Sequence, residues 1–441
     1  MSGNGKSNGK ANGKVAYVNA RLLDPESGLD APGALLTEGP RIADLGPSLF
    51  NDGVPEGIRV VNCGGLCLAP GLVDMRVQLR EPGEEHKETI ESASLAAATG
   101  GVTSMAALPN TEPVVDDVAG VEYVARRARE VKLVKIYSYG AVTRRLEGEE
   151  ITEIGLLSDF GAVGFTDGLK AVADAQVMRR ALTYSTAFDQ LIVQHPEEPA
   201  LAGGVMNDGE LATRLGLAGI PVAAEVIMLE RDLRLVELTG GRYHAAHVST
   251  AESVAVIRAA KARGLPVTCD TAPHYFILNE TAVGDYRTFA KVSPPLRSEA
   301  DRQAIAEAVA DGTIDAIASD HSPHDQDSKR LPFALADYGI VGLESLLALS
   351  LELVHKEQLS LLDLLARLTA TPAKLLGLEA GRLEAGGPAD LVLFDPGKPR
   401  RLDPDSFRSK SKNSPFEGHP VQGEVLRTVV DGRTIFEAGS A

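Results

Sequence analysis

Histidine and aspartate residues follow short apolar runs at several places in the middle of the chain. Imidazole and carboxylate groups presented together are the ligands that catalytic zinc sites use, so the pattern indicates a metal-dependent hydrolase site. A single histidine of this kind is more often a hydrogen-bonded structural residue, but a whole set at strand ends favours a functional site. The set consists of Asp167, His195, His247, His274 and Asp320.

Eight apolar runs of strand length predict the scaffold that positions these residues, and helix-period segments separate most of them. Residues 87–98 form one such segment, and Gly100 and Gly101 follow it as a signal for the end of a helix. Alternation of this kind predicts an α/β fold, a (β/α)8 barrel of the TIM type, whose catalytic groups lie at the carboxyl ends of the strands. The runs are 72–79, 102–108, 133–139, 162–165, 190–194, 243–248, 266–270 and 314–319.

The two ends of the chain have a different residue pattern from the middle. Residues 15–69 and 384–438 contain short β-branched stretches broken by proline and glycine, which is typical of strands and turns. We expect them to form one small β-sandwich domain built from both chain ends, with the barrel in residues 70–383. Residues 1–14 repeat an Asn-Gly-Lys unit without any apolar run, which predicts a flexible tail.

The composition is that of an ordinary globular protein and argues against several classes of partner. Lys and Arg number 44 against 61 Asp and Glu, a net charge of −17, and no basic patch of the kind that nucleic-acid binding needs is present. No run of about 18 apolar residues predicts a membrane span. Cys63, Cys67 and Cys269 form neither a disulfide framework nor a zinc motif, which favours a cytoplasmic setting.

Longer motifs, spread from residue 15 to residue 438 without a large gap, resemble those of one enzyme family. The chain resembles the dihydroorotases, amidohydrolase-superfamily enzymes that interconvert carbamoyl aspartate and dihydroorotate in pyrimidine synthesis. The resemblance implies a barrel with a small β domain assembled from both chain ends. The motifs are VDMRVQLREPG and LPNTEP in the first two strand regions, GFTDG (164–168), HPEEP (195–199), HVSTAESV (247–254), TAPHYFIL (271–278), KVSPPLRSEADR (291–302), ASDHSPH (318–324), GIVGLE (339–344) and KSKNSPFEGHPVQGEV (410–425).

The first strand departs from the family pattern at the metal site. Dihydroorotases carry a His-x-His pair here that holds the catalytic metal, and Arg76 and Gln78 stand in its place. Arginine is a permanently charged donor without a lone pair to offer, and a glutamine carbonyl is a poor zinc ligand beside imidazole. We predict that Arg76 pairs with Asp320, Asp167 or both, so that an ion pair replaces the metal. The alternative is that Arg76 is a tolerated substitution.

The resemblance also implies roles for the other strand ends. Asp167, His195 and His247 match the remaining metal ligands. Asp320 matches the ligand that doubles as general acid and base, and we expect it to be vestigial if the metal is lost.

Residues that match the family's substrate contacts are partly retained. Arg80 and Asn110 match groups that bind the substrate carboxylate, and His324 matches a group that contacts the substrate. Ser293 replaces an asparagine of the family pattern, and Gly168 replaces an aspartate.

These observations leave two main functions open. The first is a non-catalytic dihydroorotase homologue without a cofactor. The chain resembles inactive dihydroorotase-like chains that assemble with aspartate carbamoyltransferase, and this resemblance implies a structural subunit of that enzyme and an oligomer. The alternative is an active dihydroorotase or related cyclic amidohydrolase, which uses zinc on Asp167, His195 and His247 with an open fourth position. A small-molecule sensor has only Arg80 and Asn110 in its favour.

Overall fold

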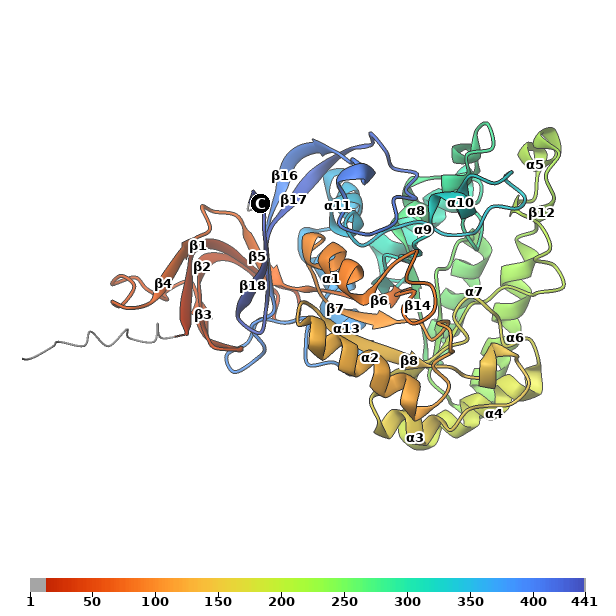
Figure 1. Ribbon diagram of the computed structural model, residues 1–441, viewed down its shortest axis with the longest axis horizontal. Helices are drawn as coiled ribbons and strands as arrows, with labels where there is room; N and C mark the ends of the chain where they lie inside the picture. The colour runs from red at the N-terminus through yellow and green to blue at the C-terminus, as the bar shows by residue number, and fades with distance from the viewer. Residues whose placement is uncertain (1–12, 440–441) are drawn as a thin grey trace, which may run out of the picture.

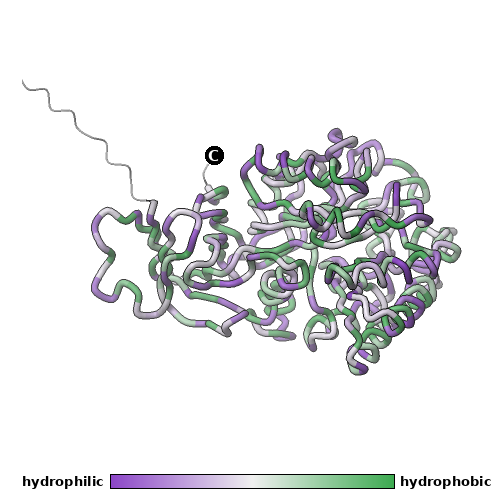
Figure 2. The backbone as a smooth tube through the Cα atoms, turned by 90° about the horizontal axis from the view of Figure 1, so that it is seen from below, coloured by the Kyte–Doolittle hydropathy of each residue, from purple (hydrophilic) through white to green (hydrophobic). Residues whose placement is uncertain are grey.

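The computed structural model describes residues 13–439 of the chain. Most of the tail predicted for residues 1–14 lies outside this range, and Lys14 begins the first strand. Figure 1 shows a strand-rich part made from both chain ends beside a larger part in which helices surround strands. The turned view of Figure 2 shows the same two parts, with hydrophilic and hydrophobic residues alternating along the outer helices.

Strands from the two chain ends form one sheet of the order β18-β17-β16-β5-β1-β2-β3, and β4 pairs with β1. Tyr17 and Leu35 from the first strands share a hydrophobic core with Leu391 and Val429 from the last strands. The sheet therefore closes over a core of its own, as in a β-sandwich. The strands are β1 Lys14–Asp24, β2 Leu29–Glu38, β3 Arg41–Gly46, β4 Arg59–Asn62, β5 Cys67–Pro70, β16 Leu391–Arg401, β17 Pro420–Val430 and β18 Arg433–Glu437.

The middle of the chain folds into the predicted barrel. Its strands follow the order β15-β14-β13-β10-β9-β8-β7-β6, and a parallel bridge between Val77 and His321 brings the first strand beside the segment after the last. Each predicted run overlaps one strand, and we call the end at which the carboxyl ends of the strands lie the mouth. The strands are β6 Leu72–Val77, β7 Val102–Ala107, β8 Lys135–Gly140, β9 Ala162–Phe165, β10 Ile192–Gln194, β13 Tyr243–Ala245, β14 Val267–Thr271 and β15 Ala316–Ile317.

Helices lie outside the barrel (Figure 1). Helix α1 begins at Ile90 rather than at residue 87, because the Thr89 side chain caps it by accepting a hydrogen bond from the Ser92 amide, and Gly100 ends it. No helix among residues 13–439 is long and apolar enough to cross a membrane. The α-helices are α1 Ile90–Thr99, α2 Val118–Val131, α3 Ile154–Asp159, α4 Ala175–Ser185, α5 Glu210–Leu215, α6 Ala223–Thr239, α7 Ala251–Ala262, α8 Pro273–Ile277, α9 Glu299–Asp311, α10 Gln326–Lys329, α11 Leu346–His355, α12 Leu361–Leu368 and α13 Ala370–Leu375.

Short elements complete the fold. Strands β11 and β12 pair with each other outside the two large sheets. The short elements are β11 Met206–Asn207, β12 Gly219–Ile220, and the 3-10 helices η1 Arg144–Leu146, η2 Thr186–Phe188, η3 Glu280–Val283, η4 Thr288–Ala290 and η5 Pro404–Ser406.

Candidate functional site

Arg76 stands where the resemblance expects a metal ligand. It belongs to β6, all of whose residues are buried, and its side chain is 2% exposed. Its Nε donates to Oδ1 of Asp320 at 2.8 Å, and its Nη2 donates to the carbonyl of Gly168 at 3.2 Å. Its Nη1 has no hydrogen-bond partner within residues 13–439. The predicted ion pair is therefore present, and its carboxylate is that of Asp320.

Gly168 presents its carbonyl to this guanidinium from a left-handed backbone, with a φ of 69°. Glycine adopts this conformation without the steric penalty that a side chain brings. A Cβ at this position would also lie 3.3 Å from the Cβ of Asn110. The glycine that replaces the family's aspartate is thus part of the environment of Arg76.

Asp167, which follows β9, is held by Thr143 rather than by the arginine. One carboxylate oxygen accepts from the Thr143 amide at 2.9 Å, and the other accepts from the Thr143 hydroxyl. Burial raises the pKa of Asp167 to about 6, and the hydrogen bonds from Thr143 oppose this rise. Of the two carboxylates predicted as partners of Arg76, Asp320 pairs with it and Asp167 is bonded to Thr143 instead.

Asp320, just beyond β15, depends on Arg76 for its charge balance. Burial raises the pKa of Asp320 to about 6, and the charge of Arg76 acts against this rise. Nε2 of His274 lies 3.9 Å from the second carboxylate oxygen. Burial lowers the pKa of His274 to about 3, so this imidazole is neutral near pH 7 and supplies no cation.

His195 and His247 face each other across the mouth. Nδ1 of His195 lies 3.1 Å from Nε2 of His247. Two nitrogens on one tetrahedral zinc ion, each at about 2.05 Å, are separated by about 3.3 Å, so this pair keeps a spacing that a metal could use. Burial, followed by the charge of Arg76, holds the pKa of His247 well below its usual value.

A complete zinc site does not fit the residues around this pair. Asp167 is bonded to Thr143, and Asp320 is bonded to Arg76. In the described part of the chain, no group of three or more His, Cys, Asp or Glu side chains could hold a metal ion. Structural and catalytic zinc sites use at least three protein ligands, so the ligand set predicted for the alternative function is not assembled.

Gln78, the second replaced position, belongs to a polar network. Its Nε2 donates to the Ser322 hydroxyl at 2.8 Å, and its Oε1 accepts from Nδ2 of Asn110 at 3.1 Å. The side chain therefore uses both its donor and its acceptor to connect the loops that follow β7 and β15.

The residues matched to substrate contacts lie in the same network. Arg80 has a left-handed backbone, with a φ of 60°, and donates to the Pro323 carbonyl at 3.1 Å and to Glu84 at 2.8 Å. Its Nη2 lies 3.0 Å from Nε2 of His324. Arg80 and His324 are therefore in contact, and Asn110 reaches them through Gln78 and a serine hydroxyl. The structure brings all three predicted contacts together.

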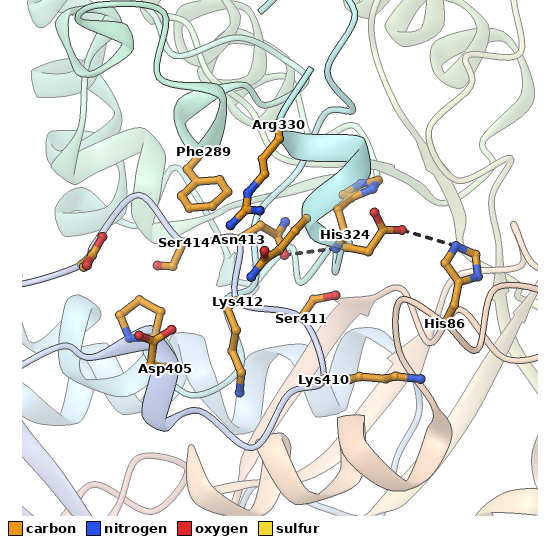
Figure 3. Close-up of a pocket in the computed structure, with 14 residues that line it drawn as sticks. His86, Phe289, His324, Arg330, Asp405, Lys410, Ser411, Lys412, Asn413 and Ser414 are labelled. Atoms are coloured by element: carbon orange, nitrogen blue, oxygen red, sulfur yellow. Dashed lines mark hydrogen bonds and ion pairs between the residues drawn. The ribbon is translucent and has the colours of Figure 1, made fainter. Parts of the chain in front are cut away.

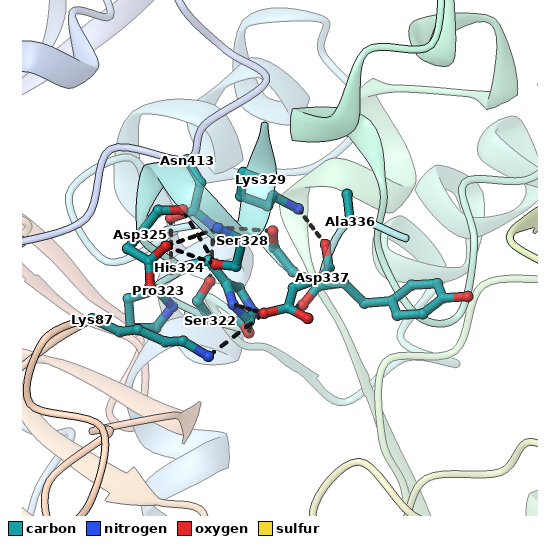
Figure 4. Close-up of polar contacts among 12 residues, drawn as sticks. Lys87, Ser322, Pro323, His324, Asp325, Ser328, Lys329, Ala336, Asp337 and Asn413 are labelled. Atoms are coloured by element: carbon teal, nitrogen blue, oxygen red, sulfur yellow. Dashed lines mark hydrogen bonds and ion pairs between the residues drawn. The ribbon is translucent and has the colours of Figure 1, made fainter. Parts of the chain in front are cut away.

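Asp337 fixes His324 from the other side (Figure 4). One of its carboxylate oxygens lies 3.0 Å from Nδ1 of His324 and 3.5 Å from the Lys87 ammonium. Its carbonyl accepts from the Lys329 ammonium at 2.7 Å. The contact with His324 holds the pKa of Asp337 well below its usual range, although burial acts against this. The loop after β15 is thus attached to the loop after β6.

Glu197 is a mouth residue to which the sequence analysis assigned no role. It lies 3.3 Å from Nε2 of His195, and it accepts from the Ser293 hydroxyl at 3.2 Å. Burial raises the pKa of Glu197, but His195 outweighs this and leaves the pKa below its usual value. Glu197 and His195 also line a cavity of about 690 Å³. The sequence signal that could have pointed to Glu197 is its partner Ser293, which replaces an asparagine of the family pattern.

Comparisons with known proteins agree with the motifs. A family model described as "Dihydro-orotase-like" matches residues 65–253, and one described as "Amidohydrolase family" matches residues 238–436. A Wolbachia protein named dihydroorotase, from the strain of Brugia malayi, is 47% identical over 96% of each chain. The dihydroorotase of Syntrophus aciditrophicus is 46% identical over 96% of this chain and 99% of its own.

Solved structures show the same architecture. The L-hydantoinase of Arthrobacter aurescens matches with a TM-score of 0.87 at 28% identity, over 97% of both chains. The dihydropyrimidinase of Brevibacillus agri matches with a TM-score of 0.84 at 22% identity, over 96% of this chain and 95% of that one, which supports the fold alone. The chain is 46–47% identical to relatives named dihydroorotase over nearly the full length of both proteins. It therefore belongs to the dihydroorotase family of the amidohydrolase superfamily.

Proposed function

We propose that this protein is a dihydroorotase-family member that has lost metal-dependent hydrolysis and acts as a structural subunit in de novo pyrimidine synthesis. The observation that carries the proposal is the 2.8 Å contact between Arg76 Nε and Asp320, at the position expected for a metal.

The chemistry of the family requires the two first-strand histidines that Arg76 and Gln78 replace. Hydrolysis of a cyclic amide at neutral pH needs an activated water, and the resemblance assigns that activation to a metal held by first-strand histidines. The guanidinium has no lone pair for a metal, and its positive charge opposes binding of a cation nearby. Asp320 could still accept a proton, but it is now hydrogen-bonded to Arg76. A general base alone gives a much smaller acceleration than an activated water.

The partner that we propose is aspartate carbamoyltransferase, and it rests on the resemblance to dihydroorotase-like chains that assemble with that enzyme. In this arrangement the barrel would be maintained by packing and by surface contacts rather than by catalysis, since a fold can outlast the site that it carries. The proposal also expects an oligomer and a cytoplasmic setting, as the pathway would require.

An active dihydroorotase is the second candidate, and specific observations favour it. The relatives compared above are named dihydroorotase, and none of those names refers to a non-catalytic subunit. His195 and His247 keep a spacing suited to one metal ion, and Arg80, Asn110 and His324 remain at the mouth. His247 and Asp320 also keep left-handed backbones, with φ of 39° and 50°, a strain that is common at active sites.

Turnover by the purified full-length chain separates the two candidates. Formation of dihydroorotate and its hydrolysis should both be measured with zinc supplied and after chelation. We expect neither reaction to exceed the background rate in either condition. Zinc-dependent turnover by the unmodified chain would refute the proposal and establish the second candidate.

Reversion of the two replaced positions provides a matched comparison. We expect Arg76→His with Gln78→His to bind zinc and to gain zinc-dependent turnover, and Asp320→Asn in that background should remove the turnover again. The partner is tested separately, by co-expression with the aspartate carbamoyltransferase of the same genome and measurement of the molar mass of the purified complex. Elution of two separate proteins would exclude this partner.

A further inference from the structure

A groove of about 760 Å³ lies near the amino ends of β8 and β9, at the opposite end of the barrel from the mouth. Helix α2 forms one wall, and the turns before β9 and between β17 and β18 form others. Figure 1 shows α2 and α3 next to each other on the outside of the barrel. We call this space the α2–α3 groove. The apolar part of its lining includes Val121, Ala125, Ala128, Val134 and Phe160.

Exposed apolar side chains continue the groove onto α3. Leu156 is 48% exposed, and Phe160, whose amide donates to the Leu156 carbonyl at 3.2 Å, is 45% exposed. The ring of Phe188, which is 38% exposed, packs against α3 where Gly155 leaves room for it. Contiguous apolar surface of this kind is uncommon on a protein that acts alone, and it marks an interaction site.

Four cationic side chains gather at the same groove. Arg126, Arg129 and Lys132 follow one another at intervals of three residues along α2 and at its end, so they share one face. Nη2 of Arg433 donates to the Lys132 carbonyl at 3.3 Å, which places this arginine beside the end of α2. Arg129 and Phe160 line both the groove and the hollow next to it. The cations and the apolar side chains therefore border one continuous space.

The acidic groups near the groove do not cancel this charge. Asp431 pairs with Lys135 at 3.0 Å, and Glu122 is the other acidic residue of the described lining. Glu130 lies 4.0 Å from Arg126, but both side chains are exposed, so solvent screens this pair. The whole chain carries a net charge of −17, and the groove is a local reversal of it. Like charges this close repel one another, and an acidic partner would relieve the repulsion.

We propose that the α2–α3 groove docks an acidic amphipathic helix of a different protein. The apolar lining fits the apolar face of such a helix, and the cations around it fit its carboxylates. Residues 1–12 of this chain contain two lysines and no acidic residue, so their charge excludes them as the occupant. A second copy docked through the same groove would bring the same cations face to face. The groove and the mouth lie at opposite ends of the barrel, so the inference goes beyond the proposed function and does not depend on catalysis.

Titration of the full chain against a fluorescent synthetic peptide tests the proposal. The peptide has about 15 residues, with leucine on one helical face and glutamate on the other. We expect saturable binding, measured by fluorescence anisotropy, with a Kd of about 100 μM or tighter. A peptide with lysine in place of glutamate should bind at least about tenfold more weakly, because it meets like charge. A peptide with serine in place of leucine should lose as much, because it buries no apolar surface in the groove.

Variants locate the binding site. Arg129→Glu with Lys132→Glu should weaken binding of the glutamate peptide at least about tenfold, and so should Phe160→Ser. Arg330→Glu and Leu335→Ser are the matched controls, because both side chains are exposed and lie outside the groove. Arg330 lines a separate cavity beside the loop after β15 (Figure 3). Both controls should bind the peptide as the unmodified chain does, and circular dichroism checks that every variant is folded.

Several results would overturn the proposal. Absence of saturable binding, equal binding of the lysine peptide, or unchanged affinity in the groove variants would each do so. Sedimentation of the chain alone covers the remaining occupant. Self-association that the groove variants abolish would assign the groove to a second copy of this chain instead.

Discussion

Replacing Arg76 by methionine should destabilise the protein strongly at alkaline pH. Methionine is a flexible apolar side chain that fills much of the same space, but the change leaves Asp320 without its cation. The two side chains are 2% and 11% exposed, so solvent screens the remaining carboxylate poorly. Removing one partner of a buried pair costs about 3–5 kcal/mol of the free energy of unfolding, and loss of the contact with the Gly168 carbonyl adds to this.

The effect has a defined dependence on pH. The pKa of Asp320 is about 6, above its ordinary value of 3.8, so this carboxyl favours the folded state increasingly as the pH falls from 6 toward 4. Arg76 lowers that pKa, and its removal should raise the pKa further. Between the higher pKa of the variant and pH 6, the difference from the unmodified protein should shrink by about 1.4 kcal/mol for each pH unit. The destabilisation is therefore largest above the variant's pKa and smallest below about pH 6.

Urea unfolding at about pH 8 and about pH 5.5 measures this difference. The chain contains no tryptophan, so far-ultraviolet circular dichroism is the suitable signal. Adding Asp320→Asn to the variant should recover most of the loss at the higher pH, because the uncompensated charge is gone. Arg180→Met controls for the loss of an exposed arginine of α4 that has no ion pair within residues 13–439. An equal loss at both pH values, or no recovery on adding Asp320→Asn, would refute the reasoning.

Two further changes test the groups around the ion pair. Thr143→Val should raise the pKa of Asp167 above about 6 and lower the free energy of unfolding by about 1–3 kcal/mol at pH 8. Urea unfolding measures this loss, with Thr183→Val on an exposed helix face as the control. An unchanged free energy of unfolding would contradict the assigned hydrogen bonds. Asp337→Asn should lower the pKa of His324 and cost less than about 1 kcal/mol, since the aspartate is 43% exposed. Nuclear magnetic resonance titration of His324 checks the second change, and an unaltered pKa would count against the contact.

The barrel could be predicted from the sequence because its strands are local features. A strand buried on both faces is a continuous apolar run, and helix signals separate these runs. Even β15, which is only Ala316–Ile317, lies within the predicted run 314–319. The start of α1 was misplaced because the capping side chain of Thr89, rather than the apolar period, decides where the helix begins.

Among the side-chain contacts of the site, the sequence predicted only the ion pair of Arg76, because a buried charge has few possible partners. A buried guanidinium needs a carboxylate, and the strand ends offered Asp320 and Asp167, so the pair itself could be predicted. The choice between the two could not, because it depends on Thr143, an ordinary hydroxyl residue in the loop after β8. The contact between Glu197 and Ser293 joins two loops 96 positions apart and depends on how each loop folds.

The presence of Arg76 where the family pattern has a metal-ligating histidine changes the charge balance of the whole mouth. A divalent cation could balance both Asp320 and Asp167, whereas a guanidinium carries one positive charge. The structure compensates for the difference through Thr143 and through a pKa of about 6 at Asp167, which lets this carboxyl take up a proton more easily. The charge of Arg76 thus balances one carboxylate, that of Asp320, and hydrogen bonds from Thr143 stabilise the other, that of Asp167.

This balance predicts that the two reversions are not additive. Arg76→His alone removes the cation and restores only one of the two first-strand histidines of the family pattern, so it should unfold at lower urea concentrations than the unmodified chain at about pH 8, with or without zinc. Adding Gln78→His should make the unfolding midpoint zinc-dependent, and zinc at about 100 times its Kd should stabilise this double variant by about 2.7 kcal/mol. Gln78→His alone keeps Arg76 and serves as the control, with no response to zinc expected. Zinc stabilisation of the Arg76→His variant alone, equal to that of the double variant, would show that Gln78 is not the missing second ligand.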